Sequence, residues 1–478
     1  MTSPEFNELT VEFLDLPGDN RLVSSWTGAS ITHHFLEPCR TFSLTLGDER
    51  LGEYMKGVLA PGSRVVLRAD GAILLAGRLD SIRCEVSKSG GTTMYLDGRD
   101  GMAAVCDSCA DPFIRMKEGA KLVDILAKHL GPFGFKGFEI DSGADVAAVQ
   151  GFFSGRRNRA PGASAKRGRR RKRKKGLDAY TQKLLNPVVG EGTFKFLERI
   201  CRREGLYLWA SADSETCIVS SPDVYQEPMY ELTLRRDGSS NNVLSSSATW
   251  DWKNQASAIF VGGASYSAQF GKSRHQVGII NPLVGIASDG FPTDKVRDLF
   301  ARHKDVIPLV VQYDEKLTPY LAGSEIAKPE FLIDQDAQTV KQTEFFCRRR
   351  LSECMRRAFT YTAEVAGWDQ DGITWTPDTF VAVDDELTGT RLNLYILACT
   401  YRKSVDGGTT TKLTCVLPES MRWLDRDSEA NDYQNADEVP KREPLYSIKL
   451  VEIQGDPEYV KLQRDIVNAM VIKDVGDL

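Results

Sequence analysis

Two stretches, 61–96 (PGSRVVLRADGAILLAGRLDSIRCEVSKSGGTTMYL) and 377–413 (PDTFVAVDDELTGTRLNLYILACTYRKSVDGGTTTKL), repeat one pattern and decide the fold. Each begins with Pro and a turn residue, continues as an alternating strand into an Asp-containing turn, and then runs as a long strand into Gly-Gly-Thr-Thr. The first Gly follows the Pro by 29 residues in one stretch and by 30 in the other. Such hairpins could recur by chance, but the matched spacing favours two copies of one antiparallel β-barrel.

The remaining patterns predict a mainly β protein with α+β parts: two related antiparallel β-barrel domains and two smaller α/β peripheral domains, the second barrel being discontinuous. We predict helices at 119–130 and 337–357, and paired strands at 249–254 and 257–266. The expected domains are a first barrel at 1–105, an α+β domain at 106–230, a second barrel at 231–272 and 358–420, an inserted α+β domain at 273–357, and a C-terminal extension at 421–478.

Length and composition indicate a multidomain soluble chain made in a cytosol. The 478 residues exceed the roughly 250–300 at which single cores stop growing. We find no apolar run near the ~20 residues that span a bilayer, and the acidic N-terminus does not have the layout of a signal peptide. The ten cysteines lie mostly in apolar patterns, as reduced buried thiols do. Cys106-Asp-Ser-Cys109 is the one CxxC motif, and no second ligand pair at metal spacing accompanies it.

The segment 156–175 concentrates positive charge in an otherwise acidic chain. It holds twelve basic residues and no acidic one: Arg156, Arg157, Arg159, Lys166, Arg167, Arg169, Arg170, Arg171, Lys172, Arg173, Lys174 and Lys175. Removing these twelve from the 61 basic residues leaves 49 against 66 acidic residues, a net charge of −17. We favour a contact with acidic protein surfaces over a solvated loop. Binding of nucleic acid comes third, because no aromatic residues are interleaved for stacking on bases.

The stretch 191–219, EGTFKFLERICRREGLYLWASADSETCIV, predicts a short amphipathic helix followed by a hairpin. Gly205 fits the left-handed position that ends a helix. By itself this pattern indicates packing rather than chemistry.

Six positions of this stretch resemble a signature of the baseplate hub proteins of contractile-tailed phages and related injection machines, a family that includes the N-terminal part of VgrG. They are Phe196, Leu197, Ile200, Gly205, Leu206 and Tyr207. The order of segments over roughly residues 5 to 420 resembles that family too. The resemblance implies a homotrimer in which two barrels per chain and three chains per ring place six similar barrels around a channel, adapting a sixfold tail tube to a threefold spike.

The partners implied by the resemblance are the tail tube protein, the central spike protein, the tape-measure protein and neighbouring baseplate or wedge proteins, with transient contact with DNA in the channel. The implied location is the virion, in the tail baseplate, without a membrane anchor. The basic segment and the long extension depart from the family pattern. A hub-like protein of a noncontractile tail and a tail-associated peptidoglycan hydrolase remain alternatives.

Motifs for catalysis, metal or cofactor binding do not stand out, so we expect no catalytic residues, no metal and no cofactor. His33 and His34 lie on one expected strand and point to opposite faces. His129 lies near the end of a predicted helix, where a cation is favoured. The acidic turn 384–386 is expected to be solvated.

Overall fold

The computed structural model describes 8–16, 22–23, 26–47, 59–69, 71–88, 91–114, 122–140, 186–201, 206–224, 226–253, 255–263, 275–287, 291–309, 311–313, 327–334, 337, 340–405, 407–422 and 471–473. The basic segment 156–175, Gly205 and nearly all of the extension 421–478 lie outside the described residues. The predictions for these parts therefore stay predictions.

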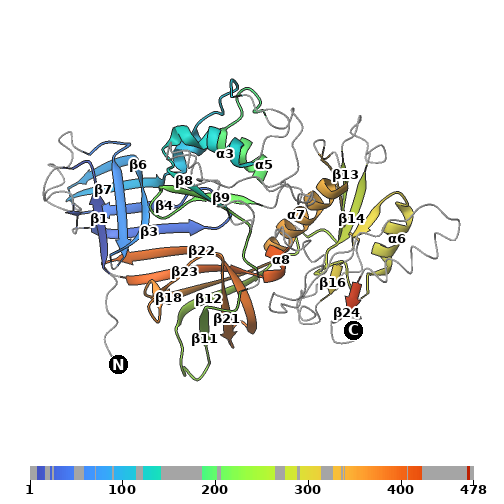
Figure 1. Ribbon diagram of the computed structural model, residues 1–478. Coiled ribbons are helices and arrows are strands. Elements are labelled where there is room, and N and C mark those ends of the chain that lie inside the picture. Colours follow the sequence, from blue (N-terminus) through green and yellow to red (C-terminus); the bar gives the residue numbers. More distant parts are fainter. Residues whose placement is uncertain are drawn as a thin grey trace, which may run out of the picture.

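Thirteen strands form one large, mainly antiparallel sheet, which confirms the predicted fold class (Figure 1). Module 1 consists of β1 (Leu9–Phe13), β2 (Leu22–Val23), β3 (Trp26–His34), β4 (Thr41–Leu46), β5 (Arg64–Ala69), β6 (Ala72–Ser87) and β7 (Gly91–Asp100). Module 2 consists of β11 (Tyr230–Leu234), β12 (Val243–Trp250), β18 (Phe359–Ala366), β21 (Thr379–Asp385), β22 (Thr390–Ser404) and β23 (Gly408–Val416). The strand order is β12-β18-β23-β22-β3-β4-β7-β6-β5-β1-β2, with β21 on β22 and β11 on β21, so the two modules meet where β22 pairs with β3.

The two modules share one register across five strands. The pairings of β3-β4-β7-β6-β5 match those of β12-β18-β23-β22-β21 residue for residue, apart from one extra bulge at Leu74 in β6. Two β-bulges recur at equivalent places: Asp80 in β6 corresponds to Leu397 in β22, and Thr27 in β3 corresponds to Leu244 in β12. Because a bulge re-aims the side chains that follow it, these matches show that the segments beginning at Pro61 and Pro377 fold alike, as the internal repeat predicts.

The turn glycines of the repeat have the same backbone conformation. Gly91 and Gly408 close the β6–β7 and β22–β23 hairpins with φ angles of 69° and 67°. A Cβ atom added at either glycine would meet nothing within 4 Å, so the cost of a side chain comes from the backbone alone.

We therefore expect Gly91→Ala and Gly408→Ala to lower the free energy of unfolding by the same amount, about 1 kcal/mol each. Urea unfolding of the two variants measures the effect. Gly137→Ala is the control, because Gly137 has equally open surroundings without a positive φ angle. A cost at one hairpin several times larger than at the other would contradict the equivalence of the turns.

The modules differ in the strand that follows the shared five. In module 1, β1 is antiparallel to β5, whereas in module 2 β11 is parallel to β21. Asn242 links β11 to the start of β12: its side-chain oxygen accepts from the Thr233 N–H at 2.8 Å, and its Nδ2 donates to the Glu231 carbonyl at 2.7 Å. These bonds bring the two ends of module 2 together, although no strand ladder closes either module among the described residues.

The interior of module 2 contains a charged side chain, Asp385. This residue is fully buried, so the expectation that the turn 384–386 is solvated was wrong at its central position. Its carboxylate accepts hydrogen bonds from the hydroxyls of Ser246 and Tyr361 and from the backbone N–H groups of Leu387 and Thr388. These four donors replace the hydrogen bonds that water would give an exposed carboxylate, so the Asp385 side chain can be buried.

The first peripheral unit, the hairpin unit, follows module 1 in sequence. It comprises α2 (Ala103–Asp107), α3 (Leu122–Leu130), the 3-10 turn η2 (Gly131–Phe133), β8 (Gly137–Ile140), α5 (Thr193–Cys201), β9 (Tyr207–Ala210) and β10 (Thr216–Ser220). Its sheet has the order β8-β10-β9. The structure confirms the helix and hairpin predicted for 191–219.

The second peripheral unit, the inserted unit, interrupts module 2. It contains β13 (Ala258–Gly263), β14 (Gln276–Ile280), α6 (Asp294–Arg302), β15 (Ile307–Leu309), β17 (Pro329–Asp334) and α7 (Val340–Ala358), and its sheet has the order β15-β14-β13-β17. The predicted pairing of 249–254 with 257–266 was wrong, because β12 pairs with β18 whereas β13 pairs with β14 and β17. Every residue of β13 is buried, as in a central strand of a covered sheet. The predicted domain boundary at 272 is therefore too late, since β13 already belongs to the inserted unit.

The remaining described elements are short: β16 (Val311–Tyr313) pairs with β24 (Val471–Lys473), β19 (Asp369–Gln370) pairs with β20 (Ile373–Thr374), and α8 (Pro418–Arg422) follows β23. The described helices include none with the length and apolar composition needed to cross a membrane.

Candidate functional site

The junction between the modules is a seven-residue antiparallel ladder between β3 and β22, running from His34↔Ala398 to Gly28↔Ser404. A backbone bond frames each end: the Phe35 N–H donates to the Leu397 carbonyl at 2.9 Å, and the Val405 N–H donates to the Thr27 carbonyl at 3.2 Å. The ladder makes one continuous sheet from both modules, and Figure 1 shows β22 beside β3. Continuous backbone pairing fixes the modules at one relative orientation.

One face of this continuous sheet is rich in hydroxyl groups. Along each strand, apolar residues that point into the cores alternate with small polar residues on the opposite face. The hydroxyl residues of this face include Ser30, Thr32, Thr41, Ser43, Thr45, Ser81, Thr93, Ser245, Ser247, Thr249, Thr360, Thr362, Thr400, Thr410 and Thr414. Charges of both signs occur among them, on Arg83, Glu85, Asp97, Arg99, Glu364, Arg402 and Lys412. The face also carries the ring of Tyr95, and the Arg83 guanidinium lies 4.4 Å from its centroid. This hydroxyl face therefore mixes small hydroxyl groups with charges of both signs.

The root of the β9–β10 hairpin packs on the junction. The ring of Phe35, which directly follows β3, lies 5.1 Å from Trp209, 5.9 Å from Tyr207 and 6.1 Å from Tyr395 of β22. The Tyr395 hydroxyl donates to Asp378 at 2.6 Å, and burial raises the pKa of Tyr395 well above its usual value. The hairpin unit thus contacts both modules at the point where they join.

The tip of the same hairpin bonds to module 1. The Ala76 N–H of β6 donates to the Ala212 carbonyl at 2.7 Å, and the Gly101 N–H, just after β7, donates to Ser214 Oγ at 2.9 Å. Ser214 itself has a φ of 57° and donates back to the Ala76 carbonyl. Since the hairpin is anchored at both root and tip, it braces the junction.

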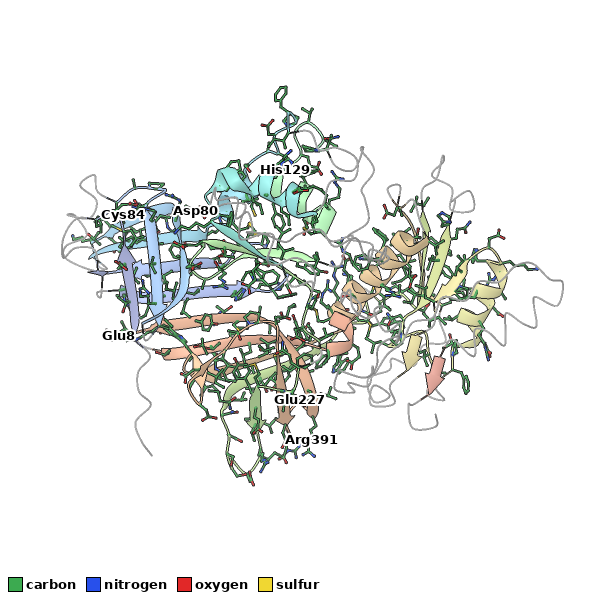
Figure 2. The ribbon with its side chains drawn as sticks, in the orientation of Figure 1. Glu8, Asp80, Cys84, His129, Glu227 and Arg391 are labelled. Atoms are coloured by element: carbon green, nitrogen blue, oxygen red, sulfur yellow. The ribbon has the colours of Figure 1, made fainter. Side chains whose placement is uncertain are left out.

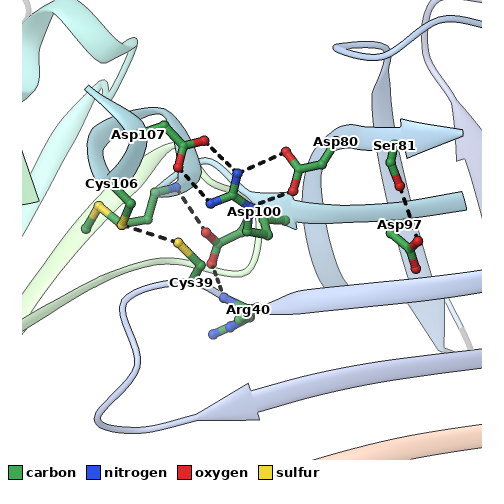
Figure 3. A network of polar contacts seen from close by, with 10 residues as sticks. Cys39, Arg40, Asp80, Ser81, Asp97, Asp100, Cys106 and Asp107 are labelled. Atoms are coloured by element: carbon green, nitrogen blue, oxygen red, sulfur yellow. Dashed lines mark hydrogen bonds and ion pairs between the residues drawn. The ribbon is translucent and has the colours of Figure 1, made fainter. Parts of the chain in front are cut away.

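An ion-pair network joins the bulge of β6 to α2 (Figure 3). Arg99 of β7 bonds Asp80 at 2.6 Å and Asp107 at 2.6 Å, each through a side-chain nitrogen. Because Asp80 is the bulge residue, the bulge directs its carboxylate toward the hairpin unit. Figure 2 shows Asp80 on the side of module 1 that faces this unit.

Next to this network, Asp100 accepts hydrogen bonds from the backbone N–H groups of Arg40 at 2.9 Å and Met102 at 3.0 Å. Burial raises the pKa of Asp100 to about 6, although both bonds act in the opposite direction. The described polar groups around this contact tie the end of β7 to the loop before β4.

The comparisons with known proteins agree with this architecture. The sequence matches no family model and no curated protein. The tail protein from Neisseria meningitidis MC58 is 18% identical, with a TM-score of 0.60 over 86% of this chain and 98% of that chain. The prophage MuSo2 43 kDa tail protein from Shewanella oneidensis is 14% identical, with a TM-score of 0.60 over 87% of this chain and 99% of that chain.

This chain has the fold of phage tail proteins. The resemblance noted from the sequence is thereby confirmed at the level of fold.

Within the phage tail fold, five of the six signature positions are described and buried. Phe196, Leu197, Ile200 and Leu206 are at most 1% exposed and form the core of the hairpin unit, whereas Tyr207 takes part in the contact with Phe35. Gly205 lies outside the described residues. Four of the signature residues thus form the core of the hairpin unit, and Tyr207 contributes to its contact with the junction.

His129 lies in the last turn of α3, as the sequence predicted, but its surroundings do not favour a cation. It is buried against the ring of Phe196 at 4.8 Å, and burial lowers the pKa of His129. The expected charge was wrong because His129 lies on the buried side of α3, whereas Lys128 in the same turn is exposed.

The CxxC motif does not form a pair of neighbouring thiols. Cys106 Sγ lies 3.5 Å from Cys39 Sγ, whereas Cys109 is exposed. Seven of the ten cysteines are buried and all ten are free thiols, as predicted from their apolar surroundings. In the described parts of the chain, no group of three or more His, Cys, Asp or Glu residues is placed to hold a metal ion.

Sequence reasoning missed the residues that make the junction. Phe35, Trp209 and Tyr395 lie in three separate parts of the chain, and each sits in a pattern typical of an ordinary strand or turn. A local pattern cannot connect residues that meet only after the two modules pair.

Proposed function

We propose that this chain is a structural baseplate hub of a phage tail, a homotrimeric ring that adapts a sixfold tail tube to a threefold central spike. One observation carries the proposal: five strands and two bulges of module 1 have equivalents in module 2. A chain with two equivalent modules can present six of them in a closed ring of three copies. Three copies of a chain with one module would present only three.

The hydroxyl face supports a role in lining the channel of this ring. Tight binding of DNA needs clustered cations, and single strands also bind to exposed aromatic rings. The hydroxyl face combines small neutral groups with charges of both signs, and the Arg83 side chain lies over its Tyr95 ring. A channel wall of this kind lets the tape-measure protein and DNA pass without binding either tightly. In this proposal the chain has no catalytic role.

The remaining partners follow from the same arrangement. The two rims of the ring contact the tail tube protein and the spike protein, and neighbouring baseplate proteins surround it in the virion. The basic segment 156–175 binds acidic surfaces of neighbouring subunits, because the rest of the chain has a net charge of −17.

Native mass spectrometry of the full chain tests the proposal. We expect a species with three times the 53.1 kDa mass of one chain, and threefold symmetry in images of the particle. A stable monomer or an even-numbered ring would contradict the proposal. A cleared band in peptidoglycan zymography would instead favour the hydrolase alternative.

A further inference from the structure

The two modules are equivalent, so each strand of the β22–β3 junction has an equivalent in the other module. These two equivalent strands do not pair with each other within the described chain. Within the chain, residues 398–404 of β22 pair with β3. The equivalent of 398–404 in module 1 is 81–87 of β6, and the equivalent of β3 in module 2 is β12. Among the strands that the structure describes, residues 82–86 of β6 pair only with β7, and residues 245–249 of β12 pair only with β18.

Both edges carry apolar side chains that water contacts in a single chain. Val86 at the end of β6 is 78% exposed, and Leu244, the bulge residue of β12, is 61% exposed. Trp250 at the other end of β12 packs on Phe359 and is still 45% exposed. Proteins usually protect an edge strand with Lys, Pro or an inward charge. β12 has the sequence VLSSSATW, with no charged residue and no Pro.

We infer that residues 82–86 of β6 in one copy pair antiparallel with β12 of a second copy, repeating the β22–β3 junction between chains. The contact joins two different edges, so it is head-to-tail and generates a ring or a filament. That the ring closes at three copies rests on the proposed function. The pairing itself rests on the shared register.

The register of this contact follows from the junction within the chain. Tyr401 pairs with Ile31 there, and the equivalent residues are Cys84 and Ala248. Ile82 then lies opposite Trp250, and both belong to the core-facing side of their strands. On the other side, Glu85 lies opposite Ser247, which continues the hydroxyl face across the subunit boundary. On the core-facing side Cys84 lies opposite Ala248, whereas Val86 lies opposite Ser246. This register keeps the core-facing sides of the two strands together and their outward sides together.

A disulfide between copies tests this register, because Cys84 is already present and only Ala248→Cys is needed. Directly opposite residues in an antiparallel pair have Cα atoms about 4.5–5.5 Å apart, within the range of a disulfide. After mild oxidation with oxidised glutathione, we expect most of the A248C protein to run as a covalent three-chain species on a nonreducing gel. Peptide mapping should find Cys84 of one copy linked to the thiol introduced at position 248 of another.

Two control variants make the result specific. In T249C, the new thiol lies on the opposite face of β12 from Cys84, so we expect at least a tenfold lower yield of linked chains. In the C84S/A248C variant the link should be lost. Hydrogen exchange of the unmodified protein is a second measurement: amides at 82–86 and 245–249 should gain protection together as the concentration rises.

The outcomes separate this inference from the proposed function. A trimer in which A248C forms no link to Cys84, and in which neither edge is protected, would overturn the inference and leave the hub proposal standing. A linked ladder that continues beyond three chains would support the pairing and overturn the trimer. A chain that stays monomeric at every concentration would overturn both.

Discussion

Tyr395→Ala is expected to lower the free energy of unfolding by about 4 kcal/mol, the largest effect of any single substitution at the junction. Tyr395 is fully buried and packs edge-on against Phe35 at 6.1 Å and Phe380 at 5.7 Å. Alanine would leave a cavity between β22, the end of β3 and the hairpin unit. The hydrogen bond to Asp378 would be lost as well.

Urea unfolding measures this loss, and Tyr395→Phe is the matched control. Phenylalanine keeps the ring and removes only the hydroxyl, which should cost about 1 kcal/mol. Limited proteolysis adds a local measurement: in Y395A the segment 221–229 between the hairpin unit and module 2 should be cut faster. The packing argument fails if Y395A proves as stable as Y395F.

Asp385→Ala is expected to lower the free energy of unfolding by about 3 kcal/mol. The substitution removes the acceptor of the hydroxyls of Ser246 and Tyr361 and of two backbone N–H groups inside module 2. Buried donors without an acceptor are costly, because they gave up their hydrogen bonds to water on folding. Asp384→Ala is the control: Asp384 is partly exposed and pairs with the exposed Arg391, so its loss should cost less than about 1 kcal/mol.

The effect of Asp385 should depend on pH. Burial acts to raise the pKa of Asp385, but the hydrogen bonds from Ser246, Thr388 and Tyr361 outweigh burial and lower that pKa below its ordinary value. A carboxyl whose pKa is lower in the folded chain contributes stability above the unfolded pKa of about 3.9, and loses it as the pH falls through the folded value. The difference between wild type and D385A should therefore be constant from about pH 5 to 7 and shrink below about pH 4. A difference that grows on acidification would contradict the assignment.

Much of the fold follows from local patterns in the sequence. The alternating strands and the Gly-Gly-Thr-Thr turns predicted the repeat, because a turn glycine and a period of two act over a few residues. The apolar residues around Gly205 predicted the helix and hairpin for the same reason. The errors arose where burial depended on distant elements. Asp385 was expected in water and lies inside module 2, and β13 was assigned to a barrel although it belongs to a covered sheet.

The sequence by itself determined where the strands begin and turn, and that one set of strands occurs twice. Only the tertiary structure decided that β22 pairs with β3, that Phe35 meets Tyr395, and that residues 82–86 and 245–249 each pair with a single strand among those described. The reason is physical: turns and side-chain alternation depend on neighbouring residues, whereas the choice of a strand partner depends on which edges remain open after the rest of the chain has packed.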